Sequence, residues 1–447
     1  MTFWRLSRQW SLTDSKSRKV AVLLAILGII FLIYQVFKLD YKQVEPAKLK
    51  TNWKPKKKFT SADDPDDPLY FNPYKATKRH GTIAIVVILT SSTDPADYDI
   101  AIKTTQCYAK IHGYDFILAV DTDFDCHHRD KFFRRHCAVA KLLPLYSAIL
   151  FLDADIGVIN PERKIEEFMD ERFDVIFYDR FYNWEIMAGS YIARNTQYAV
   201  DFLNEFANYE SKLPNSFHGT DNGALHIFLA EKLFPLATAE IESCRQVYNK
   251  SANYADLFTY EACIRAIMGA GTDFGKIRVM KKGTGWARDC WLTNGLWHPE
   301  LDFMLHEMKT NMLLETPNDA LKPRMGANWY NPFLGPIDVS KCNPENSTWS
   351  YDPRVIGNKQ DILDSLDKSF KRIAKLQVKS YSRIIQFLNG SPFFKSNSVL
   401  TEQRAASPVR HPAPFYTVND QERKVRLNWN KLAQLAVVFP IQRQRHR

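Results

Sequence analysis

The chain has 447 residues, 45% of them hydrophobic, and a formal net charge of +10 at pH 7. This length and composition suffice for one large core or two smaller ones. The positive charge sits at the ends: residues 1–58 hold 13 Lys or Arg against 3 acidic residues, and residues 361–447 hold 16 against 6. The body between them is therefore acidic. Since nucleic-acid enzymes concentrate positive charge on the folded body, nucleic acid is excluded as the expected partner.

The first predicted element is a membrane anchor. Residues 20–37 contain no charged residue, and basic residues flank them on both sides. As a helix at about 1.5 Å per residue they span about 27 Å, enough for a thin bilayer. The run is longer than a typical signal-peptide core and has no small-x-small cleavage site, so we expect an uncleaved single-pass anchor after a short tail, residues 1–19. The flanking charges leave its orientation open.

Residues 38–80 are rich in Lys, Pro and Asp. That composition buries too little apolar surface to fold alone, so the segment is predicted to be a stem. Beyond the stem lie three glycosylation sequons, at Asn249, Asn346 and Asn389, which fit a lumenal body. The seven cysteines show no CxxC metal spacing, and in an oxidising lumen some can pair, with at least one left over. Cys107 lies on an apolar helix face and is expected to be a packed thiol.

Strands and helices alternate in the body of the chain. Helical spacing of apolar residues runs from Ile100 to Ile111 and ends at Gly113, which favours a left-handed cap, and a second helix closes at 142–146. The predicted strands are Ile83–Leu89, Phe116–Val120, Ala148–Leu152, Asp174–Tyr178 and Ser190–Ala193. This alternation predicts an α/β fold with a mostly parallel sheet, covered on both faces, whose ligands lie at the carboxyl ends of the strands. We expect this domain to span residues 81–340, followed by a helical and basic extension, residues 341–447.

Asp153 and Asp155 follow the buried strand Ala148–Leu152 directly. Residues at i and i+2 of an extended chain point the same way, so the two carboxylates can converge on one cation. Oxygen ligands suit Mg²⁺ or Mn²⁺, usually shared with the phosphates of a substrate. The alternative, a pair of loop aspartates that cap the next turn, fits the strand context less well. A second acidic run, residues 121–125, lacks the glycine and glutamate of a calcium loop and is predicted to be a surface loop.

The ordered motifs of residues 81–310 resemble GT-A nucleotide-diphospho-sugar transferases. The chain is similar to glycosyltransferase family 34, the Golgi α-galactosyl-, mannosyl- and xylosyltransferases, and to a related nematode family of uncharacterised membrane proteins. The segments that carry the resemblance are Ile83–Leu89, His112–Tyr114, Ala140–Leu145, Phe151–Asp155, Ala188–Ser190, Arg194–Thr196, Thr220–Asn222 and Phe303–Lys309. The resemblance implies a GT-A fold and a single-pass type II protein of the Golgi or endoplasmic reticulum membrane, with its catalytic domain in the lumen.

The resemblance also implies roles for individual residues. Asp155 would hold a Mn²⁺ or Mg²⁺ ion, Asp153 would share it or touch the donor, and His306 would complete the site. The remaining implied positions comprise donor contacts at Lys141, Gly189 and Lys309 and polar groups on the sugar and acceptor side at Asp179, Asp221 and Asn222. Lys309 would lie one turn beyond His306 if that segment is helical. Purely structural roles stay open for four of these residues: an ordinary hydrogen bond for His306, a favourable first helical turn for Asp221, solvent exposure for Lys141 and a bend at Gly189.

Four tryptophans, at positions 184, 286, 291 and 297, offer flat faces for sugar rings, although aromatic residues belong more often to a core. The leading hypothesis is a metal-dependent transferase that moves a sugar from a UDP- or GDP-linked donor to a hydroxyl of a glycan or glycoprotein; the resemblance implies retention of configuration. One alternative is a haloacid-dehalogenase-like phosphatase, but Gly157 stands where that family has Thr or Val. Another is a catalytically silent Golgi lectin or scaffold, which the intact Asp153 and Asp155 argue against.

Overall fold

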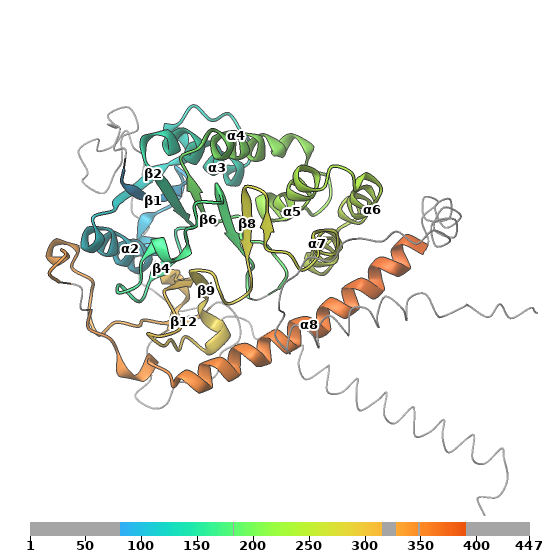
Figure 1. Ribbon diagram of the computed structural model, residues 1–447. Coiled ribbons are helices and arrows are strands. Elements are labelled where there is room, and N and C mark those ends of the chain that lie inside the picture. Colours follow the sequence, from blue (N-terminus) through green and yellow to red (C-terminus); the bar gives the residue numbers. More distant parts are fainter. Residues whose placement is uncertain (1–80, 182, 315–327, 347–348, 390–447) are drawn as a thin grey trace, which may run out of the picture. The chain divides into compact units, whose positions relative to one another are not determined.

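The computed structural model describes residues 81–181, 183–314, 328–346 and 349–389, all of which belong to one compact unit (Figure 1). The predicted anchor and stem, within residues 1–80, and the tail beyond residue 389 lie outside the described residues. Among the described helices, none combines the length and the apolar composition needed to span a bilayer.

Short strands and longer helices alternate through the described chain. The strands are β1 (Ile83–Leu89), β2 (Asp115–Val120), β3 (Ala148–Leu152), β4 (Gly157–Val158), β5 (Val175–Tyr178), β6 (Ser190–Arg194), β7 (Asp273–Phe274), β8 (Ile277–Met280), β9 (Ala287–Asp289), β10 (Met304–His306), β11 (Leu313–Leu314) and β12 (Trp329–Tyr330). The helices are α2 (Asp99–His112), α3 (Lys131–Leu142), α4 (Gln197–Asn208), α5 (Thr220–Leu233), α6 (Thr238–Tyr248), α7 (Tyr254–Met268) and α8 (Lys359–Asn389).

The central sheet has seven strands in the order β2-β1-β3-β6-β5-β8-β7. β1 runs parallel to β2 and β3, and β5 runs parallel to β8. β6 is antiparallel to both of its neighbours, and β7 is antiparallel to β8. Five of the seven strands therefore share one direction, and the predicted mixed, mostly parallel sheet is confirmed.

Both faces of this sheet are buried, as the continuous apolar run of β1 predicts. Alternate residues of β1 belong to two different clusters: Ala84, Val86 and Ile88 to one, and Ile85, Val87 and Leu89 to the other. The first cluster includes side chains of α3, α4, α5, α6 and α7, and the second includes side chains of α2 and β4. Helices thus cover the sheet on both sides (Figure 1).

The strands and helices predicted between residues 81 and 195 are confirmed within one or two residues. Gly113 caps α2 in the left-handed conformation, with φ 71°, and its N–H donates to the carbonyl of Ala109. The helix predicted to close at 142–146 ends as α3 at Leu142 and continues as one short 3-10 turn, Leu143–Leu145, because a proline stands at position 144.

The cysteines form three disulfides, Cys107–Cys342, Cys126–Cys137 and Cys244–Cys263, and Cys290 is a buried free thiol. This pattern agrees with the expected pairing that leaves one cysteine over. The expectation for Cys107 as a packed thiol is wrong: it is fully buried on α2, as the helical spacing indicates, but it is bonded to a residue 235 positions away. Sequence spacing cannot reveal so distant a partner.

The acidic run 121–125 is only partly a surface loop. Asp121 is completely buried, and its carboxylate pairs with Arg134 of α3 at 3.0 Å. Asp125 is exposed, as expected. The difference arises because Asp121 follows β2 immediately and is still covered by α3, whereas the chain has left the sheet by residue 125.

Residues after 340 continue to pack on the same unit. Trp349 lies in the core cluster that contains α2, and Cys342 is bonded to that helix. The predicted helical extension is α8, which buries Ile362, Ile373 and Ile384 and exposes most of its charged side chains.

Candidate functional site

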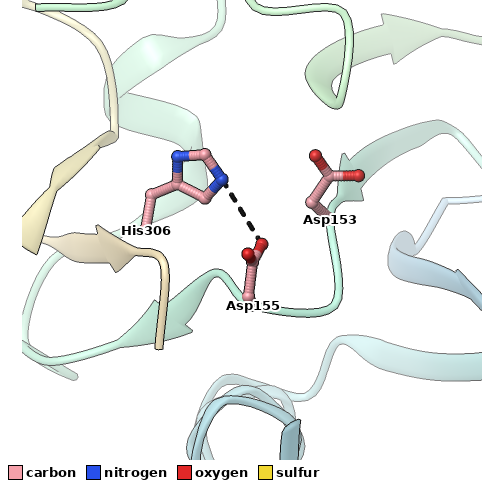
Figure 2. Close-up of side chains that lie close together, drawn as sticks. All are labelled: Asp153, Asp155 and His306. Atoms are coloured by element: carbon pink, nitrogen blue, oxygen red, sulfur yellow. Dashed lines mark ion pairs between the residues drawn. The ribbon is translucent and has the colours of Figure 1, made fainter. Parts of the chain in front are cut away.

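Asp153 and Asp155 lie where the chain leaves the central strand β3. All five residues of β3 are buried, so the chain emerges from the core at Asp153. The N–H of Ile156 donates to the carbonyl of Asp153 at 3.0 Å, which closes a tight turn before β4. The turn presents both carboxylates on the same side, opposite His306 (Figure 2). The structure therefore has the two aspartates at the carboxyl end of β3, as predicted.

A small second sheet brings His306 to this turn. Its order is β4-β10-β9, with β10 antiparallel to β4 and parallel to β9. Leu305 pairs with Gly157, only two residues beyond Asp155. The N–H of Met308 also donates to the carbonyl of Asp155 at 2.9 Å. As a result, Nε2 of His306 lies 3.3 Å from Oδ1 of Asp155 (Figure 2).

Lys309 reaches the same carboxylate by a different route from the one expected. The segment after His306 is not helical, because Glu307 adopts a left-handed conformation with φ 73°. This conformation is strained for a residue with a side chain, at a cost of about 1–2 kcal/mol. It turns the chain so that Nζ of Lys309 lies 3.2 Å from Oδ2 of Asp155. The spacing of two residues between His306 and Lys309 is therefore compatible with both side chains facing Asp155.

The second nitrogen of His306 is held from behind by Asp289, the last residue of β9. Nδ1 of His306 lies 2.9 Å from Oδ1 of Asp289, and Arg180 donates to that oxygen at 2.6 Å. A carboxylate on one ring nitrogen fixes the orientation of an imidazole and leaves the other nitrogen for a ligand. This arrangement aims Nε2 of His306 at Asp155.

The charges of this cluster are mutually compensated. Burial alone would raise the pKa of Asp155, but His306 and Lys309 beside it hold the pKa well below its usual value. Burial opposes the protonated form of His306, but Asp155 and Asp289 raise its pKa to about 10. Without a cation, Asp155 is thus balanced by an imidazolium and an ammonium.

Asp153 is anchored on its other side by α3. Arg135 donates through Nη1 to Asp153 and through Nη2 to Asp221, the latter at 3.1 Å. His136 contacts the same oxygen of Asp221 at 3.1 Å. Burial disfavours the charge on Asp221, but His136 and Arg135 outweigh it and lower the pKa of Asp221 to about 2. Asp221 is therefore an ion-pair partner that holds Arg135 against Asp153.

Gly189 is required by the Asp153 side chain. A Cβ at position 189 would lie 2.5 Å from Cγ and 2.8 Å from Oδ1 of Asp153, and closer still to Oδ2. The adjacent Ala188 N–H donates to Oδ1 of Asn222 at 3.0 Å. Asn222 thus fixes the bend before β6 that carries Gly189, and Gly189 leaves room for the carboxylate.

Two residues expected at the site contact other partners. Lys141 lies in the last turn of α3, where its ammonium donates to the carbonyl of Asp125 in an exposed position. Asp179 pairs with Arg265 at 2.9 Å, at the end of β5. Neither has a contact with Asp153 or Asp155 among those that the structure records.

The tryptophans mostly belong to the core. Trp184, Trp286 and Trp297 are buried, and the indole of Trp286 donates to Ser190 at 2.8 Å. The core alternative therefore holds for these three, and their faces are packed against other side chains rather than open to a ligand.

Sequence reasoning missed the residues that support the aspartates and His306. These are Arg135, His136, Arg180, Asp289 and Glu307. In the segment Trp286–Asp289, the sequence suggested a role for the indole of Trp286 and none for the carboxylate of Asp289. One signal could have indicated Arg135 and His136. They interrupt the apolar side of a helix that faces the sheet, and buried charges require partners.

The donor set suits a divalent cation. Asp153, Asp155 and His306 each offer one ligand atom, and these atoms lie within 4.8 Å of one another. Two carboxylates with one oriented imidazole match the oxygen and nitrogen ligands that Mn²⁺ accepts. A cation at this position would replace the proton that His306 carries, since only the neutral ring can bind metal. The residues present therefore fit the predicted ion.

Comparison with known proteins adds the following. A family model described as a protein of unknown function, DUF273, matches residues 105–323, a segment that contains the aspartates and His306. Among solved structures, the chain is similar to a glycosyltransferase involved in the glycosylation of the major capsid of PBCV-1. The two share 15% identity over 52% of this chain and 95% of that chain, with a TM-score of 0.32. No curated protein matches.

Proposed function

We propose that the protein is a metal-dependent glycosyltransferase of the GT-A type, which transfers a sugar from a nucleotide-diphosphate donor to a hydroxyl of a glycan or glycoprotein. The observation that carries the proposal is the convergence of Asp153, Asp155 and His306 at the carboxyl end of β3. A bound Mn²⁺ or Mg²⁺ would stabilise, as a Lewis acid, the negative charge of the departing nucleoside diphosphate.

The residues of the chain perform the remaining tasks in this proposal. Asp153, Asp155 and His306 hold the cation, and Asp289 keeps the imidazole oriented. Lys309, whose side chain is 40% exposed, would contact a donor phosphate in place of Asp155 when a cation is bound. Such positively charged groups act where negative charge develops in the transition state.

We further propose that the configuration of the sugar is retained. Asp221 is bound to Arg135 and His136, and Asp179 is bound to Arg265. Asp221, held by two cationic partners, is not free to take a proton from an incoming hydroxyl, which an inverting reaction requires of a general base, and Asp179 is held by an arginine. A retaining displacement on the donor face needs no dedicated base. Anomeric coupling constants in the NMR spectrum of the product distinguish the two outcomes.

The disulfides support the proposed location. Disulfides persist in oxidising compartments and are rare in the cytosol. With the predicted anchor at residues 20–37, they favour a type II protein of the Golgi or endoplasmic reticulum membrane with a lumenal catalytic domain. Protease protection of the domain in intact microsomes tests this topology.

The test of the activity is turnover of a panel of UDP- and GDP-sugars by the full chain with Mn²⁺. We expect hydrolysis or transfer that disappears on chelation and in Asp155→Ala. The matched control is Asp367→Ala, which removes an exposed carboxylate of α8. Unchanged turnover in Asp155→Ala would refute the site. Release of phosphate from a simple phosphoester, without sugar transfer, would favour the phosphatase alternative. Absence of metal-dependent UDP binding would favour a silent lectin or scaffold.

A further inference from the structure

Two exposed aromatic rings lie together near the start of α5. Phe217 is 36% exposed and Tyr254 is 65% exposed, and their ring centroids are 4.9 Å apart in an edge-to-face arrangement. The ring of Phe258 follows at 5.9 Å from that of Tyr254. Leaving such apolar faces in water is unfavourable. Paired aromatic rings at a surface are also frequent features of binding sites.

The two rings are held on a firm backbone. The N–H of Phe217 donates to the carbonyl of Ser251 at 3.0 Å, and the hydroxyl of Tyr248 donates to the carbonyl of His218 at 2.7 Å. Tyr254 is the first residue of α7, whose N-terminus is capped by the side chain of Asn253. The aromatic pair is therefore pre-organised, which lowers the entropy cost of binding a ligand.

From Phe217 the chain leads directly to the candidate site. Phe217 is four residues before Asp221, and the intervening Gly219 and Thr220 both adopt left-handed conformations, with φ 64° and 51°. The N–H of Thr220 donates to Nδ1 of His218 at 3.0 Å, which fixes this bend. Asp221 then contacts Arg135, the partner of Asp153.

A second connection leads from Tyr254 to the same place. The carbonyl of Phe258, one turn along α7, accepts the indole N–H of Trp184. Trp184 belongs to the segment that ends at Gly189, against which the Asp153 carboxylate lies. The backbone that carries Phe217 and the helix that carries Tyr254 are thus each connected to a segment that lies near Asp153.

We propose that Phe217 and Tyr254 form a subsite for a sugar ring of the acceptor glycan. This inference rests on the proposed function and adds the position of the acceptor. A pyranose has an apolar face of C–H groups and a polar rim of hydroxyls, so an exposed aromatic ring packs on the former. His218 accepts a hydrogen bond at Nδ1, so its neutral ring carries the proton on Nε2, a donor suited to a hydroxyl.

The experiment is saturation-transfer NMR with the full chain. The probes are methyl α- and β-glycosides of glucose, galactose, mannose and xylose. We expect transfer to ring C–H protons of at least one probe, and about tenfold weaker binding after Phe217→Ser with Tyr254→Ser, if each ring buries a few tens of Å² of the sugar. Phe370→Ser is the matched control, since Phe370 is an aromatic residue on α8 whose exposure (47%) lies between those of Phe217 and Tyr254.

Calorimetry with UDP or GDP and Mn²⁺ on the same samples separates this inference from the proposed function. Loss of glycoside binding in the double variant, with nucleotide binding retained and Phe370→Ser unaffected, supports the subsite. Absence of signal with every probe, or signals that persist in the double variant, overturns it. A full chain that binds neither UDP nor GDP with Mn²⁺ refutes the proposed function, whatever the glycoside signals show.

Discussion

The most specific prediction concerns Gly189, which binds nothing itself and yet determines where a proposed metal ligand can lie. In Gly189→Ala, the new methyl group would stand 2.5 Å from Cγ of Asp153, whereas ordinary contacts begin at 3.4 Å. The carboxylate would therefore have to retreat by about 1 Å. Because Arg135 holds that carboxylate from the other side, the movement also disturbs a buried ion pair.

The expected effects follow from that displacement. Sites that must hold a group within about 0.5 Å lose much of their function when it moves further, so we expect roughly 100-fold weaker Mn²⁺-dependent turnover. Overpacking of this kind also lowers the free energy of unfolding by about 1–3 kcal/mol. The assay is turnover against Mn²⁺ concentration, with urea unfolding on the same samples. Gly335→Ala is the control, because a Cβ there meets nothing within 4 Å.

A double-mutant cycle identifies the cause. If the clash with the carboxylate is responsible, Gly189→Ala should cost much less stability in an Asp153→Ala background than in the parent chain, and the two changes should not be additive. Full additivity, or a Gly189→Ala protein with unchanged metal-dependent turnover, would refute the reasoning that places Asp153 on the proposed cation.

Three further predictions follow from the surroundings of the site. Asp289→Asn should weaken Mn²⁺ binding by about 10- to 100-fold, since the orientation of His306 depends on that carboxylate; equal affinity by calorimetry would contradict it. Cys342→Ser should lower the free energy of unfolding by about 2–5 kcal/mol in urea, because the broken disulfide closes a long loop; an unchanged midpoint would count against this. Burial, and then Glu185, raise the pKa of Glu261, whose carboxylate oxygens have no hydrogen-bond partner in the described part of the chain. The folded state then holds a proton that the unfolded state releases above about pH 4.5, so the free energy of unfolding should fall as pH rises from there. Glu261→Gln should flatten this fall between pH 5 and 8. Parallel curves of unfolding free energy against pH for both proteins would rule out Glu261 as its source.

Much of the central sheet was predictable, because its strands carry signals over several residues. β1 and β3 are continuous apolar runs, and Gly113 marks the end of α2. The location of Asp153 and Asp155 at the carboxyl end of β3 was predictable for the same reason. Their convergence was expected from an extended chain, whereas the structure produces it through a tight turn that the Ile156 N–H closes.

The partners of these aspartates could not be derived in that way. β4, β9 and β10 have only two or three residues each, too few for a periodic pattern. Their pairing, and the left-handed Glu307 that turns Lys309 back, depend on contacts between distant parts of the chain. His306 and Lys309 were therefore predicted as site residues only from a family resemblance. Asp289 and Arg135 were missed because the sequence alone does not show that these charged side chains are buried.

The pairing of β10 with β4 has a consequence for biosynthesis. The proposed metal ligands Asp155 and His306 are about 150 residues apart, and this short pairing, with the neighbouring backbone bond from Met308 to Asp155, brings them together. A chain emerging from the ribosome can therefore complete β1, β2 and β3 long before it possesses a site able to retain a nucleotide. Ligand capture by nascent chains arrested at successive lengths should begin only after residue 309 has cleared the exit tunnel.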